Sequence, residues 1–397
     1  MSKPLLTKIK ELASTYYTSV VENRRHIHAH PELSFQEHNT AQFICDQLKK
    51  YGIPFQQHIA QTGVVAYIEG VNPSKKTIAL RADMDALPIQ EENDISYKSK
   101  HNGIMHACGH DVHTASLLGT ARILNDLKSE WEGTIKLIFQ PGEEKLPGGA
   151  SQMIKEGVLK NPDVTHILGQ HVMPQLPVGK IGFRKGMYMA SSDEIYLTIH
   201  GKGGHAALPD LLIDPITISA QIITALQHLV SRMANPKIPT VLSFGKINGN
   251  GATNVIPDMV NIEGTFRTMD EAWRKQAHEK IKKTATQLAE AMGASCECTI
   301  VKGYPVLVND SVLTERMMHA ATDFIGKENV VEIDKWMASE DFAYYSHEIP
   351  SCFYRLGVRK NETAPIFPVH TSTFTIDEAA LQIGVGLMAW LAIEGLT

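Results

Sequence analysis

The residues with the most obvious chemistry form a short run at positions 105–113, which reads Met-His-Ala-Cys-Gly-His-Asp-Val-His. Cys108 and His110 are two residues apart, so an extended backbone or a tight turn can direct both side chains to one side, where they could share a metal ion. The alternative is a buried cysteine beside surface histidines, and the run taken alone favours that alternative. The rest of the chain must decide between the two interpretations.

Polar residues also follow three predicted strands. These residues can bind metals or transfer protons: Asp83 and Asp85 after the strand at 76–81, Glu143 and Glu144 after 133–139, and His171 after 166–169. In open α/β sheets the functional site is built at the carboxyl ends of the strands. Paired glutamates on a surface turn are common, but this pair follows an apolar strand and a Pro-Gly turn, which exposes it at the same edge of the sheet.

Together the candidates offer one thiolate, several imidazoles and two carboxylates: Cys108, His110, Glu143, Glu144, His171 and His370. This donor set suits Zn²⁺, Mn²⁺ or Co²⁺ better than a hard calcium ion. A structural zinc site usually closes its shell with four Cys or His at short paired spacings, whereas these donors run from position 108 to position 370. The dispersion favours a catalytic site assembled by the fold. Because Glu143 and Glu144 are adjacent, one can bind metal while the other acts as a general base on water.

The composition is that of an ordinary globular protein. With 397 residues, two domains are expected. A net charge of −5 without clustered Lys and Arg gives no support for a nucleic-acid partner. We expect no membrane span, and the N-terminal segment lacks an apolar signal core, so a cytoplasmic location is expected. Five scattered cysteines do not form a disulfide framework.

Strands and helices alternate before residue 186, which predicts an α/β fold with a mainly parallel, helix-covered sheet. The first helix is expected over residues 3–25 and is followed by a polar loop at 24–32. The helix after the Cys108 run is expected to begin near Thr114. From about residue 187 the order becomes β-α-β-β-α-β, which is typical of a ferredoxin-like sandwich. We therefore expect a catalytic domain in two parts (1–186 and 303–397) with an inserted lid or dimerisation domain (187–302).

The inserted domain carries its own candidate residues. His205 lies among the glycines of residues 201–207, where the backbone can approach a ligand or another chain closely. Asn254 and Arg267 could hold a substrate carboxylate, the arginine in a bidentate manner. The alternative is that Asn254 is an ordinary amide in a turn and that Arg267 is a surface charge at the end of a strand. An exposed strand edge would allow this domain to dimerise.

Eight ordered segments resemble the M20 metallopeptidase/aminoacylase family, and specifically its amidohydrolase branch of hippurate hydrolases, N-acyl-amino-acid deacylases and auxin-conjugate hydrolases. The resemblance covers essentially the whole chain. It rests on residues 24–34 (Arg-Arg-His-Ile-His-Ala-His-Pro-Glu-Leu-Ser), 81–88 (Arg-Ala-Asp-Met-Asp-Ala-Leu-Pro), 105–111, 140–144 (Gln-Pro-Gly-Glu-Glu), 170–172 (Gln-His-Val), 201–207 (Gly-Lys-Gly-Gly-His-Ala-Ala), 339–342 (Ser-Glu-Asp-Phe) and 370–371 (His-Thr).

The resemblance implies two divalent metal ions held by five residues: Cys108, which would bridge them, His110, Glu144, His171 and His370. It implies that Glu143 is the general base and then the proton donor. The wider family usually carries His-x-Asp at the first strand end, but this chain has Asp83-Met84-Asp85. We therefore expect Asp83 and Asp85 to orient the ligands rather than to bind metal.

The resemblance also implies that His205 steadies the oxyanion from the lid domain, and that Asn254 and Arg267 bind the substrate carboxylate. The expected activity is metal-assisted hydrolysis of small N-acyl amino acids of the acetyl or benzoyl type, by a homodimer or homotetramer formed through the lid domain. A dipeptidase or aminopeptidase with the same metals is one alternative. A non-catalytic binding protein is another, which the presence of Glu143 and every expected ligand disfavours.

Overall fold

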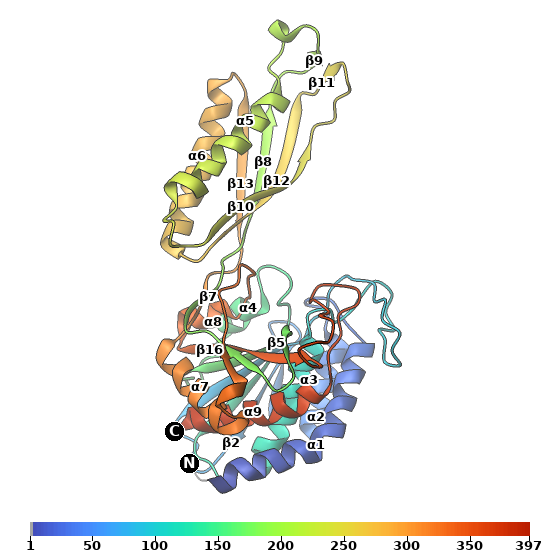
Figure 1. The fold of residues 1–397 in the computed structure, drawn as a ribbon, viewed down its shortest axis with the longest axis vertical. Coiled ribbons are helices and arrows are strands. Elements are labelled where there is room, and N and C mark those ends of the chain that lie inside the picture. The colour runs from blue at the N-terminus through green and yellow to red at the C-terminus, as the bar shows by residue number, and fades with distance from the viewer. Residues whose placement is uncertain (1–2) are drawn as a thin grey trace. The chain divides into compact units, whose positions relative to one another are not determined.

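The computed structural model describes residues 3–397, and the chain forms two compact units (Figure 1). Unit 1 contains the residues up to Gly186 together with 308–334 and 341–397. Unit 2 contains residues 187–307 and the short segment 335–340. The chain therefore leaves unit 1 and returns to it twice.

Unit 1 is built on an eight-stranded mixed sheet with the order β1-β2-β4-β3-β5-β16-β6-β15. Its central strands β4, β3, β5 and β16 are parallel to their neighbours in this group, while β1, β2 and β6 add antiparallel pairings on either side. The strands are β1 (Phe55–Ile59), β2 (Gly63–Glu69), β3 (Thr77–Asp83), β4 (Thr134–Gln140), β5 (Ile167–Pro177), β6 (Ile181–Phe183), β15 (Val330–Glu332) and β16 (Ser351–Arg359).

Helices cover this sheet, and α3 and α9 contact its central strands directly while α1 lies against both of them. Every residue of β3 and of β4 is buried, as expected for parallel strands covered on both faces. The helices of unit 1 are α1 (Lys3–Ala29), α2 (His38–Lys50), α3 (His110–Asp126), α4 (Gly149–Lys155), α7 (Ser311–Ile325), α8 (Ala343–Glu348) and α9 (Ala379–Leu396), with a short 3-10 turn at Lys327–Asn329.

The C-terminal helix α9 is unusually apolar. By length and composition it could cross a membrane, but 78% of it is buried within the structure. Its side chains contribute to the same hydrophobic core as those of α1, α3 and the central strands. The core of unit 1 therefore accounts for its apolar character.

Unit 2 contains a four-stranded antiparallel sheet of order β10-β12-β8-β13, with the helices α5 and α6 in contact with each other (Figure 1). In β8, Ile195, Leu197 and Ile199 are buried and alternate with more exposed residues, so one face of the sheet packs against the helices. The elements are β8 (Asp193–His200), α5 (Pro215–His228), β10 (Thr240–Asn248), β12 (Met259–Thr268), α6 (Glu271–Ala291) and β13 (Ser295–Lys302).

Smaller elements complete the chain. The two-residue strands β9 (Gly204–His205) and β11 (Val255–Ile256) pair with each other as a separate antiparallel two-stranded sheet. A 3-10 turn (Pro209–Leu211) precedes α5, and a π-helical turn (Leu229–Met233) follows it. The strands β7 (Gly186–Met189) and β14 (Leu307–Asn309) lie where the chain passes between the units.

Two predicted boundaries near the candidate site are wrong. The first helix continues to Ala29, so Arg24 and His28 lie within it and are buried, whereas a polar loop was expected. The helix after Cys108 begins at His110 and not near Thr114, because Gly109 adopts a left-handed conformation with φ 86° and turns the chain directly into the helix. The first error arises because tertiary contacts bury charged side chains that the sequence suggests are exposed, and the second because glycine can turn the chain abruptly.

Candidate metal centre

The sheet brings the predicted strand-end residues to a single edge. Asp83, the last residue of β3, is in register with Gln140, the last residue of β4, and the two strands are parallel. On the other side β3 pairs in parallel with β5, which carries His171. The Glu143-Glu144 pair follows β4 by three residues. Parallel strands end on the same side of a sheet, so Asp83 and the Glu143-Glu144 pair meet there. His171 was expected after a strand ending at residue 169, but it lies inside β5, which continues to Pro177; it is near the end of β3 because β3 pairs with β5 up to Gly169.

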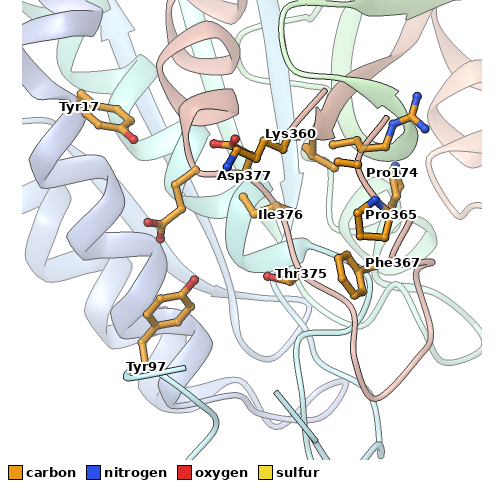
Figure 2. Close-up of a pocket in the computed structure, with 13 residues that line it drawn as sticks. Tyr17, Tyr97, Pro174, Lys360, Pro365, Phe367, Thr375, Ile376 and Asp377 are labelled. Carbon is orange, nitrogen blue, oxygen red and sulfur yellow. The ribbon is translucent and has the colours of Figure 1, made fainter. Parts of the chain in front are cut away.

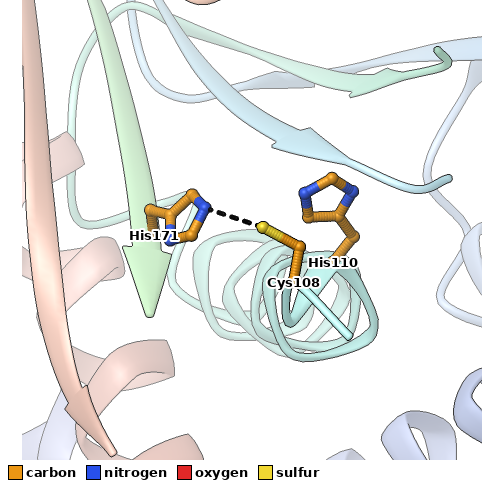
Figure 3. Close-up of side chains that lie close together, drawn as sticks. All are labelled: Cys108, His110 and His171. Carbon is orange, nitrogen blue, oxygen red and sulfur yellow. Dashed lines mark hydrogen bonds between the residues drawn. The ribbon is translucent and has the colours of Figure 1, made fainter. Parts of the chain in front are cut away.

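The thiol of Cys108 lies at the centre of the gathered side chains. Its Sγ is 3.5 Å from Nε2 of His171 and 3.3 Å from Nε2 of His370. Figure 3 shows the Cys108 side chain between His110 and His171, with its sulfur directed at the ring of His171. Glu144 completes the group, because its Oε1 is 3.2 Å from Nε2 of His370.

Two sets of three donors can be drawn from these residues, and Cys108 belongs to both. One set contains Cys108, His110 and His171, and the other contains Cys108, Glu144 and His370. Within each set the potential ligand atoms lie within 4.8 Å of one another. A thiolate shared by two donor sets is suited to bridging two metal ions.

The backbone around Cys108 explains why these side chains converge. A side chain at position 109 would place its Cβ 2.6 Å from the Val172 side chain, so only glycine fits beside the strand that carries His171. The amide of His370 donates to the carbonyl of Ala107 at 2.7 Å, which ties the loop bearing His370 to the Cys108 run. Three distant segments are thus held together by local backbone contacts.

Two of the imidazoles are oriented in the manner of metal ligands. Nδ1 of His110 faces the carbonyl and carboxylate oxygens of Asp85 at 2.9 and 3.1 Å, and Nδ1 of His171 faces the carbonyl of Val172 at 2.7 Å. When Nδ1 donates its proton to such a partner, Nε2 is left with the lone pair that a metal requires. Nε2 of His110 is buried and has no hydrogen-bond partner among residues 3–397. This donor arrangement fits a divalent cation.

Asp83 and Asp85 both contact His110, and each is held by further hydrogen bonds. The second oxygen of Asp85 accepts from the hydroxyl of Ser34 at 2.6 Å and from the backbone N–H of Glu144 at 2.9 Å. Asp83 binds Nδ1 of His113 at 2.6 Å and is 3.7 Å from Nε2 of His110. Both carboxylates are fully buried, so their positions are fixed by these partners.

The neighbouring carboxylates favour positive charge at two of the imidazoles in the group. Burial opposes protonation of His110, but the nearby Asp83 and hydrogen-bonded Asp85 outweigh it and raise the pKa of the imidazole. Hydrogen bonds to Cys108 and Glu144 raise the pKa of His370 to about 10. Burial, together with Arg355, keeps the pKa of His171 well below its usual range, so that ring is neutral and able to act as a ligand. Burial raises the pKa of the Cys108 thiol, and a bound metal ion would reverse this by deprotonating it.

Glu143 lies at the edge of the donor group. Its Oε1 accepts from the backbone N–H of Asp341 at 3.3 Å, while its Oε2 is 4.0 Å from Nε2 of His110. The side chain is largely buried. One carboxylate oxygen is therefore held by the backbone, and the other faces the metal-ligand candidates.

A buried ionic cluster behind the Cys108 run was not predicted. Asp111 binds Arg24 at 2.7 Å and Nδ1 of His28 at 2.8 Å, and Nε2 of His28 in turn binds Glu91 at 3.1 Å. All four side chains are essentially inaccessible to solvent. The Arg-Arg-His-Ile-His segment was the available signal, but sequence alone did not show that these charges pair with residues 60 to 90 positions away.

His113 was also assigned no function from the sequence. It is fully buried on α3, and its Nε2 accepts the backbone N–H of Val172 at 2.9 Å, so it links Asp83 to the strand that bears His171. With Asp83 and His110 it forms a further set of potential ligands. Its spacing of three residues from His110 on a helix was the signal for a shared face.

The remaining predicted residues lie in unit 2. His205 on β9 pairs with Val255 on β11, and the N–H of Ala206 donates to the carbonyl of Asn254 at 3.0 Å. His205 and Asn254 are therefore neighbours. Arg267 lies on β12 and donates to the carbonyl of Met337 at 3.0 Å, and burial lowers its pKa. The roles of these three residues stay predictions.

A separate cavity of about 570 Å³ lies in unit 1 (Figure 2). Tyr17, Tyr97, Lys360, Phe367 and Asp377 are among the residues that line it. None of the potential metal ligands described above contributes to its walls. It is therefore distinct from the donor group, although the chain between Phe367 and Asp377 also carries His370.

Comparison with known proteins identifies the family. The model for peptidase family M20/M25/M40 matches residues 79–394. The chain belongs to this family. Its relatives include proteins named as amidohydrolases, and the protein is accordingly a hydrolase of amide bonds.

Two sequence relatives and one solved structure bear on the activity of this family member. An N-acyl-L-amino acid amidohydrolase from Geobacillus stearothermophilus is 45% identical over 302 residues, covering 76% of this chain and 81% of that protein. Thermostable carboxypeptidase 2 from Saccharolobus solfataricus is 38% identical over 393 residues, or 98% of each chain. The crystal structure of the Bacillus subtilis YXEP protein, described as a dinuclear metal-binding M20 peptidase, has a TM-score of 0.83 and 37% identity, and the match covers 96% of this chain and 99% of that one.

Proposed function

We propose that this M20 hydrolase cleaves the amide bond of small N-acyl amino acids. The observation that carries the proposal is the position of Cys108, whose thiol belongs both to a donor set with His110 and His171 and to one with Glu144 and His370. The relative named as an N-acyl-L-amino acid amidohydrolase supports the choice of substrate class. The solved dinuclear relative supports a pair of metal ions.

The five donors would hold two divalent metal ions of the Zn²⁺, Mn²⁺ or Co²⁺ type, because the set combines thiolate, imidazole and carboxylate. When bound, such ions make water more acidic and polarise the acyl carbonyl. We assign the proton transfers to Glu143. Its Oε2 takes a proton from the attacking water and passes it to the leaving nitrogen, while its Oε1 stays on the N–H of Asp341.

We further propose that unit 2 serves the substrate and the assembly. In this proposal His205 stabilises the developing oxyanion, and Asn254 and Arg267 bind the amino-acid carboxylate. Arg267 would first exchange its hydrogen bond to Met337 for the substrate. The sheet of unit 2 would form the contact of a homodimer or homotetramer, which light scattering at micromolar concentration tests directly.

A substrate panel distinguishes this activity from its closest rival. The carboxypeptidase relative favours a second candidate, hydrolysis of peptides by the same site. The metal-loaded protein should be assayed with N-acetyl and N-benzoyl amino acids and, in parallel, with free dipeptides and N-blocked dipeptides. Higher kcat/KM for the N-acyl amino acids is the expected result. Faster cleavage of the peptides, with little release of acetate or benzoate, would replace the proposal by the peptidase function.

A further inference from the structure

The Ser-Glu-Asp-Phe segment at residues 339–342 has a carboxylate that the proposed reaction does not use. Asp341 is completely buried, and it is the first residue of unit 1 after the chain returns from unit 2 at Glu340. A buried carboxylate carries a large desolvation cost unless several donors bind it. The partners of Asp341 therefore indicate what its position is needed for.

Four hydrogen bonds from three donor groups bind the carboxylate. Oδ1 accepts from Nη2 of Arg81 at 2.7 Å and from Nε2 of Gln140 at 2.9 Å. Oδ2 accepts from the same Gln140 nitrogen at 2.8 Å and from the backbone N–H of Ala150 at 2.9 Å. Arg81 also donates through Nε to the side-chain oxygen of Gln140 at 2.9 Å. The carboxylate is thus fixed to the ends of β3 and β4 and to the first turn of α4.

The same residue reaches the proposed base through its backbone. The peptide N–H of Asp341 donates to Oε1 of Glu143 at 3.3 Å. Because the carboxylate of Asp341 is bound at several points, its peptide group cannot shift without breaking those contacts. Glu143 therefore has one oxygen held in place, and rotation of its carboxylate about the last side-chain bond is restricted.

The anchor also extends toward the metal ligands. Arg81 binds Asp83 through Nη1 at 2.5 Å, and Asp83 binds Nδ1 of His113 at 2.6 Å. His113 in turn receives the backbone N–H of Val172, next to His171. A continuous chain of buried hydrogen bonds thus connects the support of the base with the strand that carries a proposed ligand.

We propose that Asp341 is a positioning residue for Glu143: its clamped carboxylate holds the residue-341 peptide N–H against Oε1, which leaves Oε2 directed at the reacting water. This inference rests on the proposed role of Glu143 as the general base. It predicts an effect on the chemical step with little effect on substrate binding, because the four hydrogen bonds to the Asp341 carboxylate come from Arg81, Gln140 and the N–H of Ala150, and none of these is among the five proposed metal ligands.

Asp341→Asn is the test variant, because it keeps the shape of the side chain. Each oxygen of Asp341 accepts two hydrogen bonds from N–H donors. In an asparagine, one of these oxygens is replaced by an NH₂ group, which cannot accept, so the two hydrogen bonds on that side are lost. We expect kcat to fall about 10- to 100-fold, as for other residues that support a catalytic group. KM should remain within about threefold, and the metal content should equal that of the unmodified protein.

Two further variants separate positioning from general damage. Asp310→Ala removes a helix cap on α7, where Asp310 accepts from Leu313 N–H at 2.7 Å away from the site, and should leave kcat within about threefold. In a Glu143→Asp background the shorter base can no longer make the same contact with the N–H of Asp341. Adding Asp341→Asn there should lower kcat by less than about threefold, since the two residues act as one unit.

The possible results are distinguishable. A large fall in kcat with unchanged KM and metal content, together with non-additivity in the Glu143→Asp background, supports the proposal. An undiminished kcat in folded, metal-loaded Asp341→Asn protein overturns it, as does a parallel loss of metal or an equal fall in both backgrounds. Failure of the proposed function would instead show as absent hydrolysis by the unmodified protein.

Discussion

Replacing Glu37 by glutamine should stabilise the protein above neutral pH. Glu37 is fully buried beneath the turn that carries Glu143 and Glu144. Its Oε1 accepts from the N–H of Gly142 at 2.8 Å, and its Oε2 accepts from the hydroxyl of Thr62 at 2.6 Å. Burial and the nearby charge of Asp85 raise its pKa from 4.5 to about 7. Glutamine retains an oxygen for Gly142 but carries no charge.

The size and sign of the effect follow from this pKa. A difference of about 2.5 pKa units corresponds to about 3 kcal/mol, since each unit is worth about 1.4 kcal/mol. Below pH 4.5 the carboxyl is protonated in both the folded and the unfolded protein, so it contributes no penalty. Between pH 4.5 and 7 the unfolded chain releases the proton while the folded protein keeps it. The free energy of unfolding therefore falls as the pH rises through this range. Above pH 7 the unmodified protein carries the full destabilisation from the buried, charged carboxylate of Glu37, and Glu37→Gln does not.

Urea unfolding from pH 5 to pH 8, followed by tryptophan fluorescence at matched metal content, measures this difference. The free energy of unfolding of Glu37→Gln relative to the unmodified protein should rise by about 2 to 3 kcal/mol over this range. Glu11→Gln, at an exposed position on α1, serves as the control and should show no such trend. A difference that does not change with pH would refute the reasoning, because it would show that Glu37 is charged in the folded protein throughout.

Three other substitutions test separate contacts. Cys108→Ala removes the donor common to both ligand sets, so metal analysis after dialysis should find at most one ion per chain, and two retained ions would contradict the bridging role. Gly109→Ala introduces a Cβ 2.6 Å from the side chain of Val172 at a φ of 86°, and it should lower stability by at least about 1–3 kcal/mol in thermal unfolding; an unchanged midpoint would show that the turn can relax. Arg274→Met in unit 2 removes the arginine that binds both oxygens of the buried Asp193, at 2.9 and 2.5 Å. Urea unfolding should show that this unit is destabilised by about 3–5 kcal/mol. A loss below about 1 kcal/mol would mean that other groups neutralise the carboxylate of Asp193.

The convergence of the predicted ligands was accessible from the sequence because parallel strands end at one edge of a sheet. The apolar runs before Asp83 and Glu143 marked two such strands, and β3 and β4 are indeed paired in parallel with every residue buried. His171 departs from this rule, because it lies inside β5, which continues to Pro177. His370 lies on no strand, so the strand-end rule did not place it beside the other candidates. The structure explains its position by the hydrogen bond from its backbone to Ala107.

The buried charges beside the site could not be predicted. Arg24 and His28 looked like part of a polar loop, because charged residues in succession usually face solvent. Their burial depends on Asp111 and Glu91, which are distant in sequence and become partners only in the folded chain. The same holds for Asp341, whose four hydrogen bonds come from β3, β4 and α4. Local sequence patterns do not predict hydrogen bonds or ion pairs between residues so far apart in the chain.

The comparison of metal content and turnover in the unmodified protein and in Glu143→Gln tests the central claim most directly. Both proteins should be assayed with the best N-acyl amino acid of the panel after metal analysis. We predict two metal ions per chain in each, with hydrolysis slowed at least about 100-fold in the variant because the proton acceptor is lost. Near-normal turnover by metal-loaded Glu143→Gln would contradict the assignment of Glu143 as the base.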